Sequence, residues 1–181
     1  ITAASDSSVN FNGAFTNVSD TGLIDADAGA KITFAGANAS MAGKIDANDS
    51  AILFSGDSAT VSGTIDGFNN STVIFSAANA LVAGGTITVD GESTLEFQQA
   101  FTVEGGTLTA KTSSWIKFTG AGTLNNAVIT LNDASQLELN ASTDVNGGSI
   151  TVNSNSLIDF RDDSSILLNF KAGAELNLNT S

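Results

Sequence analysis

The chemistry open to this chain rests mainly on its carboxylates. Its 181 residues include 19 Asp and Glu but no His and no Cys. Without His the chain lacks the usual general base and metal ligand, and without Cys it lacks disulfides and thiolate ligands. A metal site would therefore have to be built from oxygen ligands, and acid–base chemistry would depend on carboxylates with Lys or Arg.

Acidic residues and Asn gather at three places about 21 residues apart in the first part of the chain. The group comprises Asp25, Asp27, Asp46, Asn48, Asp49 and Asp66. Carboxylate oxygens suit Ca²⁺, but a complete site takes six or more oxygens, often with a bidentate Glu that is missing here. Asp and Asn also bond their own backbone in turns and tolerate the left-handed conformation. We predict Asx turns at corners of the fold, with a Ca²⁺ site as the alternative and no other cofactor.

A second group of charges lies near the end of the chain at Asp159, Arg161, Asp162 and Asp163. Paired carboxylates can act as acid and base in glycoside cleavage. Trp115 is the only Trp and Tyr is absent, which leaves few rings for sugar stacking. We therefore interpret the group as an exposed charged turn, and a carbohydrate-active enzyme is the alternative.

Thr and Ser recur in a Thr-x-Thr pattern in the middle of the chain. The members are Thr86 and Thr88, Thr107 and Thr109, Thr130, Ser149 and Thr151. Regular arrays of this kind resemble ice-binding surfaces, but Val128 interrupts the pattern and Asp replaces it in earlier repeats. Solvent-facing β-branched strand residues are the preferred interpretation.

A regular repeat must position these side chains. An Ile or Leu preceded two residues earlier by Gly or Ala returns every 20 to 22 residues, at Ile24, Ile45, Ile65, Ile87, Leu108, Ile129 and Ile150. A unit this short cannot bury its apolar face alone, so it must stack on its neighbours as one rung of a solenoid. The Gly of each unit is expected to take a positive φ and to turn the chain.

Two further apolar segments complete each repeat. Each Ile or Leu is preceded by an aliphatic residue, one outward residue and then usually Phe, as in Val73 and Phe75, with the Phe position 11 or 12 residues upstream. This alternation with period two is typical of strands with one buried face. A third segment carries Met41, Val61, Val82, Val103, Leu124 and Val145. Three short strands per rung are therefore predicted.

These patterns predict an all-β, parallel β-helix (β-solenoid) with about eight rungs of ~21 residues. It forms a single domain over residues 1–181, with regular rungs at about 7–160 and a degenerate final rung at 161–181. The segment Ala172–Leu178 resembles Ala28–Phe34, which predicts the first strand of a ninth rung. Lys117 should lie between Glu96 and Glu138 on neighbouring strands.

The stretch Phe75–Asn79 and the following Gly84-Gly85-Thr86-Ile87 resemble motifs of autotransporter and polymorphic membrane protein passenger domains, as do Gly105–Leu108 and Gly147–Ile150. The third residue of the Gly-Gly motif, usually Ala in that family, is Thr or Ser here, and Asn79 follows Phe by four residues instead of three. The resemblance implies a right-handed coil and export to the bacterial surface for adhesion.

Composition limits the partners. The net charge is −13, with 6 Lys and Arg, so the surface offers little to the phosphates of nucleic acid. The apolar runs are three or four residues long, too short to enter a membrane as a span. Neither end shows a capping repeat, so the segment is expected to be part of a longer stalk or to stack on other copies.

From the sequence we predict a non-enzymatic, extracellular structural or adhesive protein of a bacterial cell surface. Its partner would be a glycan or protein of a host or surface. The alternatives are a filament subunit joined end to end by strand stacking, and the β-helix enzyme considered above.

Overall fold

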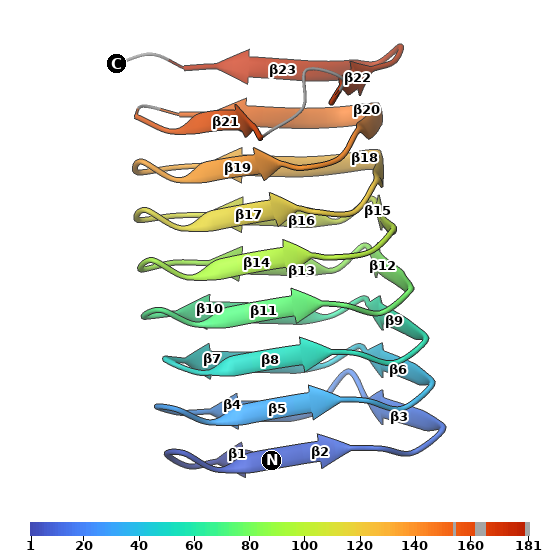
Figure 1. The fold of residues 1–181 in the computed structure, drawn as a ribbon, viewed down its shortest axis with the longest axis vertical. Helices are drawn as coiled ribbons and strands as arrows, with labels where there is room; N and C mark the ends of the chain where they lie inside the picture. Colours follow the sequence, from blue (N-terminus) through green and yellow to red (C-terminus); the bar gives the residue numbers. More distant parts are fainter. Residues whose placement is uncertain (154, 162–165, 180–181) are drawn as a thin grey trace.

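The computed structural model describes residues 1–153, 155–161 and 166–179, and all of its regular structure is β-strand (Figure 1). Strands follow one another around a coil and pair with the equivalent strands one turn later, always in parallel, for example Val73 with Ile52 and Leu95. The predicted parallel β-solenoid of about eight rungs with three strands each is confirmed. The chain passes in front from left to right, returns behind and rises, so the coil is right-handed (Figure 1).

Three columns of strands form the walls. The Phe sheet consists of β2 (Ser8–Phe11), β5 (Lys31–Phe34), β8 (Ala51–Phe54), β11 (Thr72–Phe75), β14 (Thr94–Phe97), β17 (Trp115–Phe118), β19 (Gln136–Leu139) and β21 (Leu157–Phe160). The Ile column consists of β1 (Thr2–Ala3), β4 (Leu23–Ala26), β7 (Lys44–Asn48), β10 (Thr64–Phe68), β13 (Thr86–Val89), β16 (Thr107–Ala110), the second halves of β18 (Gly122–Leu131) and β20 (Thr143–Val152), and β23 (Ala174–Leu178). The corner column consists of β3 (Phe15–Val18), β6 (Asn38–Met41), β9 (Ser58–Val61), β12 (Asn79–Ala83), β15 (Phe101–Glu104), the first halves of β18 and β20, and β22 (Leu168–Phe170).

Stacked Phe rings form the centre of the core. The rings of Phe34, Phe54, Phe75 and Phe97 lie nearly parallel with centroids 4.6 to 4.8 Å apart. All four side chains are at most 1% exposed. Because the rung spacing of a parallel sheet is about 4.8 Å, the register alone places each ring in contact with the next.

One extra ring interrupts this stack. Phe101 from the corner column lies between Phe97 and Phe118, with ring centroids 4.6 and 4.5 Å away. Its neighbour one rung later is Gly122, where an added Cβ would lie 2.1 Å from the Phe101 ring. The Phe101 ring therefore occupies core space that the missing side chain of Gly122 leaves free.

Most glycines of the Ile column differ from the prediction. Gly43 and Gly63 do not have a positive φ. An added Cβ would instead lie 2.2 Å from the Gly22 carbonyl oxygen at Gly43, and 2.0 Å from the Gly43 oxygen at Gly63. The prediction of a positive φ was wrong here, because close approach between rungs is what excludes a side chain. A positive φ is found one residue before the column, at Gly84, Gly105 and Gly147, and in the column itself at Gly148, where the prediction is confirmed.

The last rung also differs from the prediction. The segment Ala174–Leu178 pairs with the second half of β20, and Leu176 lies opposite Ile150. It is therefore the Ile-column strand of the eighth rung, and the predicted first strand of a ninth rung is wrong. Its likeness to Ala28–Phe34 led to the wrong column, because strands of the Phe sheet and of the Ile column can both follow a Gly turn and alternate inward and outward residues.

A ladder of buried Ser residues lines the corner before the Phe sheet. The amide N–H of Ser71 donates to Ser93 Oγ at 3.0 Å, and the N–H of Ser93 donates to Ser114 Oγ at 3.1 Å. Ser93 Oγ in turn donates to the Asp90 carbonyl at 2.7 Å. These hydroxyls satisfy backbone groups that the turn would otherwise leave buried without a partner.

We expect Ser93→Ala to lower the free energy of unfolding by about 1–3 kcal/mol, because it leaves the buried Ser71 N–H without an acceptor. Ser50→Ala is the matched control, since Ser50 Oγ is buried without a hydrogen-bond partner in the described structure. Urea unfolding followed by circular dichroism measures both. Equal effects of the two substitutions would contradict the role assigned to the ladder.

Candidate functional site

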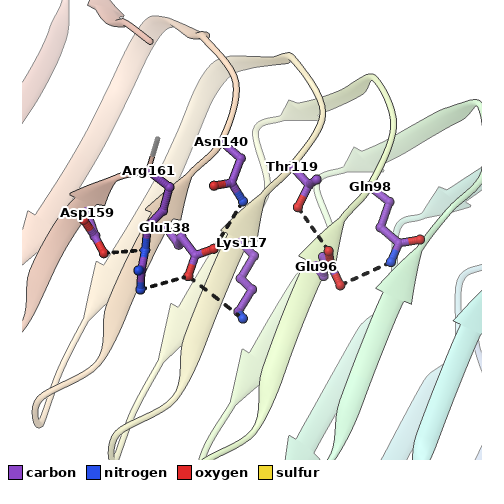
Figure 2. Close-up of polar contacts among 8 residues, drawn as sticks. All are labelled: Glu96, Gln98, Lys117, Thr119, Glu138, Asn140, Asp159 and Arg161. Carbon is purple, nitrogen blue, oxygen red and sulfur yellow. Dashed lines mark hydrogen bonds and ion pairs between the residues drawn. The ribbon is translucent and has the colours of Figure 1, made fainter. Parts of the chain in front are cut away.

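The densest cluster of ionic contacts lies on the outer face of the Phe sheet (Figure 2). Glu138 Oε2 lies 3.9 Å from Lys117 Nζ and 3.7 Å from Arg161 Nη2, and Arg161 Nε lies 2.7 Å from Asp159 Oδ2. Asn140 Nδ2 donates to Glu138 Oε1 at 3.2 Å. The Glu138 side chain is only 14% exposed, so neighbouring strands hold most of this carboxylate.

The predicted position of Lys117 is confirmed by the strand register, which places it between Glu96 and Glu138. Its ion pair, however, is with Glu138. Glu96 accepts hydrogen bonds from Gln98 Nε2 at 3.3 Å and Thr119 Oγ1 at 3.0 Å. Neutral donors thus contact Glu96, whereas two cations and the amide of Asn140 contact Glu138.

These contacts connect rungs to one another. Lys117, Glu138 and Arg161 belong to three successive rungs of the Phe sheet. Asp159 and Arg161 are paired with each other, while Asp162 and Asp163 lie outside the described residues. The cluster is an ionic ladder along the stack.

The acidic candidates for Ca²⁺ divide into two groups. Asp25, Asp46 and Asp66 are in register on the outer face of the Ile column, in β4, β7 and β10. Lys44 Nζ lies 2.8 Å from Asp46 Oδ1 and 3.5 Å from Asp66 Oδ2. All four residues line one open depression. The prediction of corner positions for Asp25, Asp46 and Asp66 was wrong, because strand pairing continues past all three.

The remaining candidates lie at or beside the turn that leads to the Phe sheet. Asp49 has a φ of 49°, its N–H donates to the Phe68 carbonyl, and its own carbonyl accepts from Gly29 N. Asn48 Oδ1 accepts from Asn69 Nδ2 at 2.8 Å. Asp27 precedes Gly29, and its carbonyl accepts from the Ala30 N–H. Within the described ranges, no three Asp or Glu form a group suited to a metal ion.

The turn interpretation leads to a first prediction for this face. We expect the same melting temperature in millimolar Ca²⁺ and in EDTA. Lys44 already neutralises Asp46, and backbone hydrogen bonds of the turn already hold Asp49 in place. Differential scanning fluorimetry measures it. A Ca²⁺-dependent rise that Asp46→Asn abolishes would favour the Ca²⁺ alternative instead.

Lys44 is the cation of this acidic face. The hydrogen bond to Asp46, supported by the charges of Asp46 and Asp66, holds the pKa of Lys44 above its ordinary value. The stabilisation is therefore complete below the unfolded-state pKa and is lost as pH rises through the folded-state pKa. Because the side chain is 48% exposed, solvent keeps this contribution small.

We expect Lys44→Met to lower the free energy of unfolding by up to about 1 kcal/mol at neutral pH and low salt, through repulsion between the aligned Asp residues. Above the folded-state pKa of Lys44 the difference from the parent protein should vanish. Lys111→Met is the charge-matched control, since Lys111 forms no ion pair within the described residues. An equal loss in both variants would show that only net charge matters.

Amide ladders are a feature that the sequence reasoning missed. Asn153 Nδ2 donates to Asn132 Oδ1, and Asn179 Nδ2 donates to Asn153 Oδ1 at 2.7 Å. Asn146 and Asn125 form the same pair at 2.8 Å. The return of Asn after 21 residues, as from Asn125 to Asn146 and from Asn132 to Asn153, was a usable signal, but Asn was assigned only to turns and to the Ca²⁺ alternative.

The Thr pattern forms an outward column. Thr88, Thr109, Thr130 and Thr151 lie in register on four successive strands, and Val128 is 39% exposed in the adjacent column. No hydrogen bond from these four hydroxyls to another side chain occurs in the described part of the chain. They face solvent, as β-branched residues on the outer face of a strand do.

The fold and these surfaces define a parallel β-solenoid repeat protein. Comparison of the chain with profiles of known families, with curated proteins and with solved structures gave no match in any of the three. Across the described residues, no helix is long and apolar enough to cross a membrane.

Proposed function

We propose that this chain is a non-enzymatic structural solenoid of a bacterial cell surface, acting as a stiff stalk or passenger segment. The observation that carries the proposal is the uninterrupted register of the Phe sheet, where eight parallel strands stack over a continuous core. Force along the stack is borne by backbone hydrogen bonds and buried side chains in every rung. The resemblance to autotransporter passenger domains supports export and adhesion.

The contacts that the outward polar side chains make with one another support the same structural role. Lys44, Lys117, Arg161 and Lys171 each contact a carboxylate, on a neighbouring rung or within their own strand. Lys171 Nζ and Asn169 Nδ2 both reach Asp144, and these bonds lower the pKa of Asp144. Contacts of this kind help to fasten adjacent rungs. A glycan or protein partner would contact the outer faces beside them.

Pulling on the two ends of a single molecule tests the stalk role. We expect stepwise unfolding, with each rung of ~21 residues releasing roughly 75 Å of chain at ~3.6 Å per residue. Phe75→Ala should lower the force of one or two steps, because it leaves a cavity in the middle of the Phe stack. The outward Ile74→Thr is the control. Release of the whole chain in one low-force event would contradict a load-bearing role.

Two further measurements test the other parts of the proposal. Antibodies against the folded solenoid should label intact cells of the bacterium that makes it, and labelling only after lysis would contradict a surface location. Release of new reducing ends from acidic polysaccharides by the purified chain would overturn the non-enzymatic assignment.

A filament subunit is the second candidate, and one observation favours it. Apolar side chains are uncovered at both ends of the stack, including Phe15 at 82% exposure and Leu178 at 66%. Stacking of copies end to end would cover them by strand addition. Light scattering and electron microscopy against protein concentration test it, and a monomer at the highest concentrations would exclude it.

A further inference from the structure

The outer face of the Ile column changes character partway along the stack. Its strands β4, β7 and β10 each present an Asp, whereas the next four strands present no charged side chain. We call this uncharged part the Thr face, and it consists of Thr86, Thr88, Thr107, Thr109, Val128, Thr130, Ser149 and Thr151. Asp66 and Glu175 border it along the stack, and Asp90 and Lys111 lie at the turn beside it. On a chain with a net charge of −13, an uncharged face of this extent is a distinct surface.

The strand register shows how far Val128 interrupts the Thr pattern. The Thr face has two outward columns, which lie two residues apart along each strand. One column is unbroken and consists of Thr88, Thr109, Thr130 and Thr151. Val128 lies in the other column, between Thr107 and Ser149, and has the branched shape of Thr with a methyl in place of the hydroxyl. The face therefore keeps one complete row of hydroxyl groups, and the second row lacks a single one.

The Thr face is both rigid and open to water. Among the described residues, none of its hydroxyl groups forms a hydrogen bond with another group of the protein. Its strands pair on both edges with parallel strands in register, and successive rungs lie nearly straight above one another (Figure 1). Because the backbone is fixed and β-branched side chains have few χ1 rotamers, little conformational entropy is lost when a rigid partner binds.

The spacing of the hydroxyl groups identifies that partner. Equivalent residues of successive rungs lie about 4.8 Å apart, and outward residues of one strand lie roughly 6.6 Å apart. In ice, tetrahedral hydrogen bonds of about 2.75 Å set next-nearest oxygens about 4.5 Å apart and give a repeat of about 7.3 Å across the hexagonal layers. Along a column of four rungs the mismatch therefore adds up to only about 1 Å. Rotation about χ1 moves a Thr oxygen by more than that.

We propose that the Thr face binds the surface of an ice crystal. Its hydroxyl groups take positions in the oxygen lattice, and the methyl groups of Thr and Val128 lie between oxygens and order the neighbouring water. A charged side chain would oppose this contact, because it would have to give up its own hydration. The acidic part of the same column, with Asp25, Asp46 and Asp66, is therefore excluded from the site. This activity goes beyond the proposed structural role and does not depend on it.

The stack of rungs explains how weak contacts could hold the chain on ice. A single hydroxyl gains little over its bonds to liquid water, but a rigid array engages several rungs at once, and simultaneous contacts slow release. A chain held in this way forces the ice front to grow as a curved surface between bound molecules. Growth then requires a temperature below the melting point, which gives a measurable signal.

Thermal hysteresis, the gap between the melting and freezing temperatures of a single ice crystal, tests the proposal on the purified full chain. We expect a gap that grows with protein concentration. Thr109→Lys, in the centre of the Thr face, should need about tenfold more protein for the same gap, because its charge loses hydration at the ice surface. Thr72→Lys is the matched control, since it makes the same change at an outward position of the Phe sheet.

Two outcomes would overturn the proposal. One is the absence of a gap in the parent protein at its highest soluble concentration, and the other is an equal loss in Thr109→Lys and Thr72→Lys. Circular dichroism during melting checks that both variants keep the fold. The pulling experiment reports on the core and not on this face, so failure of the stalk role and failure of ice binding are separate results.

A gain of activity provides a second test that requires no loss of structure. Val128→Thr completes the second row of hydroxyl groups at a position that is already 39% exposed. We expect it to widen the gap roughly twofold at equal concentration, because one more hydroxyl can bond to the lattice. Val128→Ala, which adds no hydroxyl, should not widen it. A gap that Val128→Thr leaves unchanged would show that the hydroxyl rows are not the binding surface.

Discussion

Parallel stacking in register is the constraint on which the rest of this structure depends. Each residue lies about 4.8 Å from its equivalent in the next rung, so any property of one position is imposed on a whole column. Aromatic rings become a stack, buried hydroxyls become a chain of hydrogen bonds, and backbone approach becomes a column of glycines. A column also multiplies cost, because like charges or unpaired groups would repeat in every rung.

This constraint explains which features could be predicted from the sequence. The Ile and Phe columns recur with a constant period, so the strands, the buried faces and the neighbours of Lys117 followed from spacing alone. The ion-pair partner of Lys117 could not be predicted in this way, because Lys117 lies next to two carboxylates and only side-chain geometry decides between them. The core position of Phe101 was not predicted either, because it depends on the absence of a side chain at Gly122, one rung later.

The errors share one physical origin, which is that a residue type has several uses. Glycine was assigned a positive φ when Gly43 needs closeness to the Gly22 carbonyl, and Asp25 was assigned to a turn when it lies on a strand. Ser93 and its equivalents were not singled out in the sequence, although burial makes their hydroxyls necessary. For the candidate sites, the sequence identified the charged groups but could not distinguish contacts between rungs from groups free to bind a ligand.

The same constraint gives the two ends their character. An interior strand has partners on both edges, whereas a terminal strand presents unpaired backbone and the open cross-section of every core column. A solenoid can meet this by covering its ends or by letting them cover one another. Here β1 covers only part of one column at the first end, while Phe160, Phe170 and Leu176 remain partly uncovered at the other. Because β1 pairs with β4 through only two residues, it covers this edge less completely than the four- and five-residue strands cover one another inside the stack.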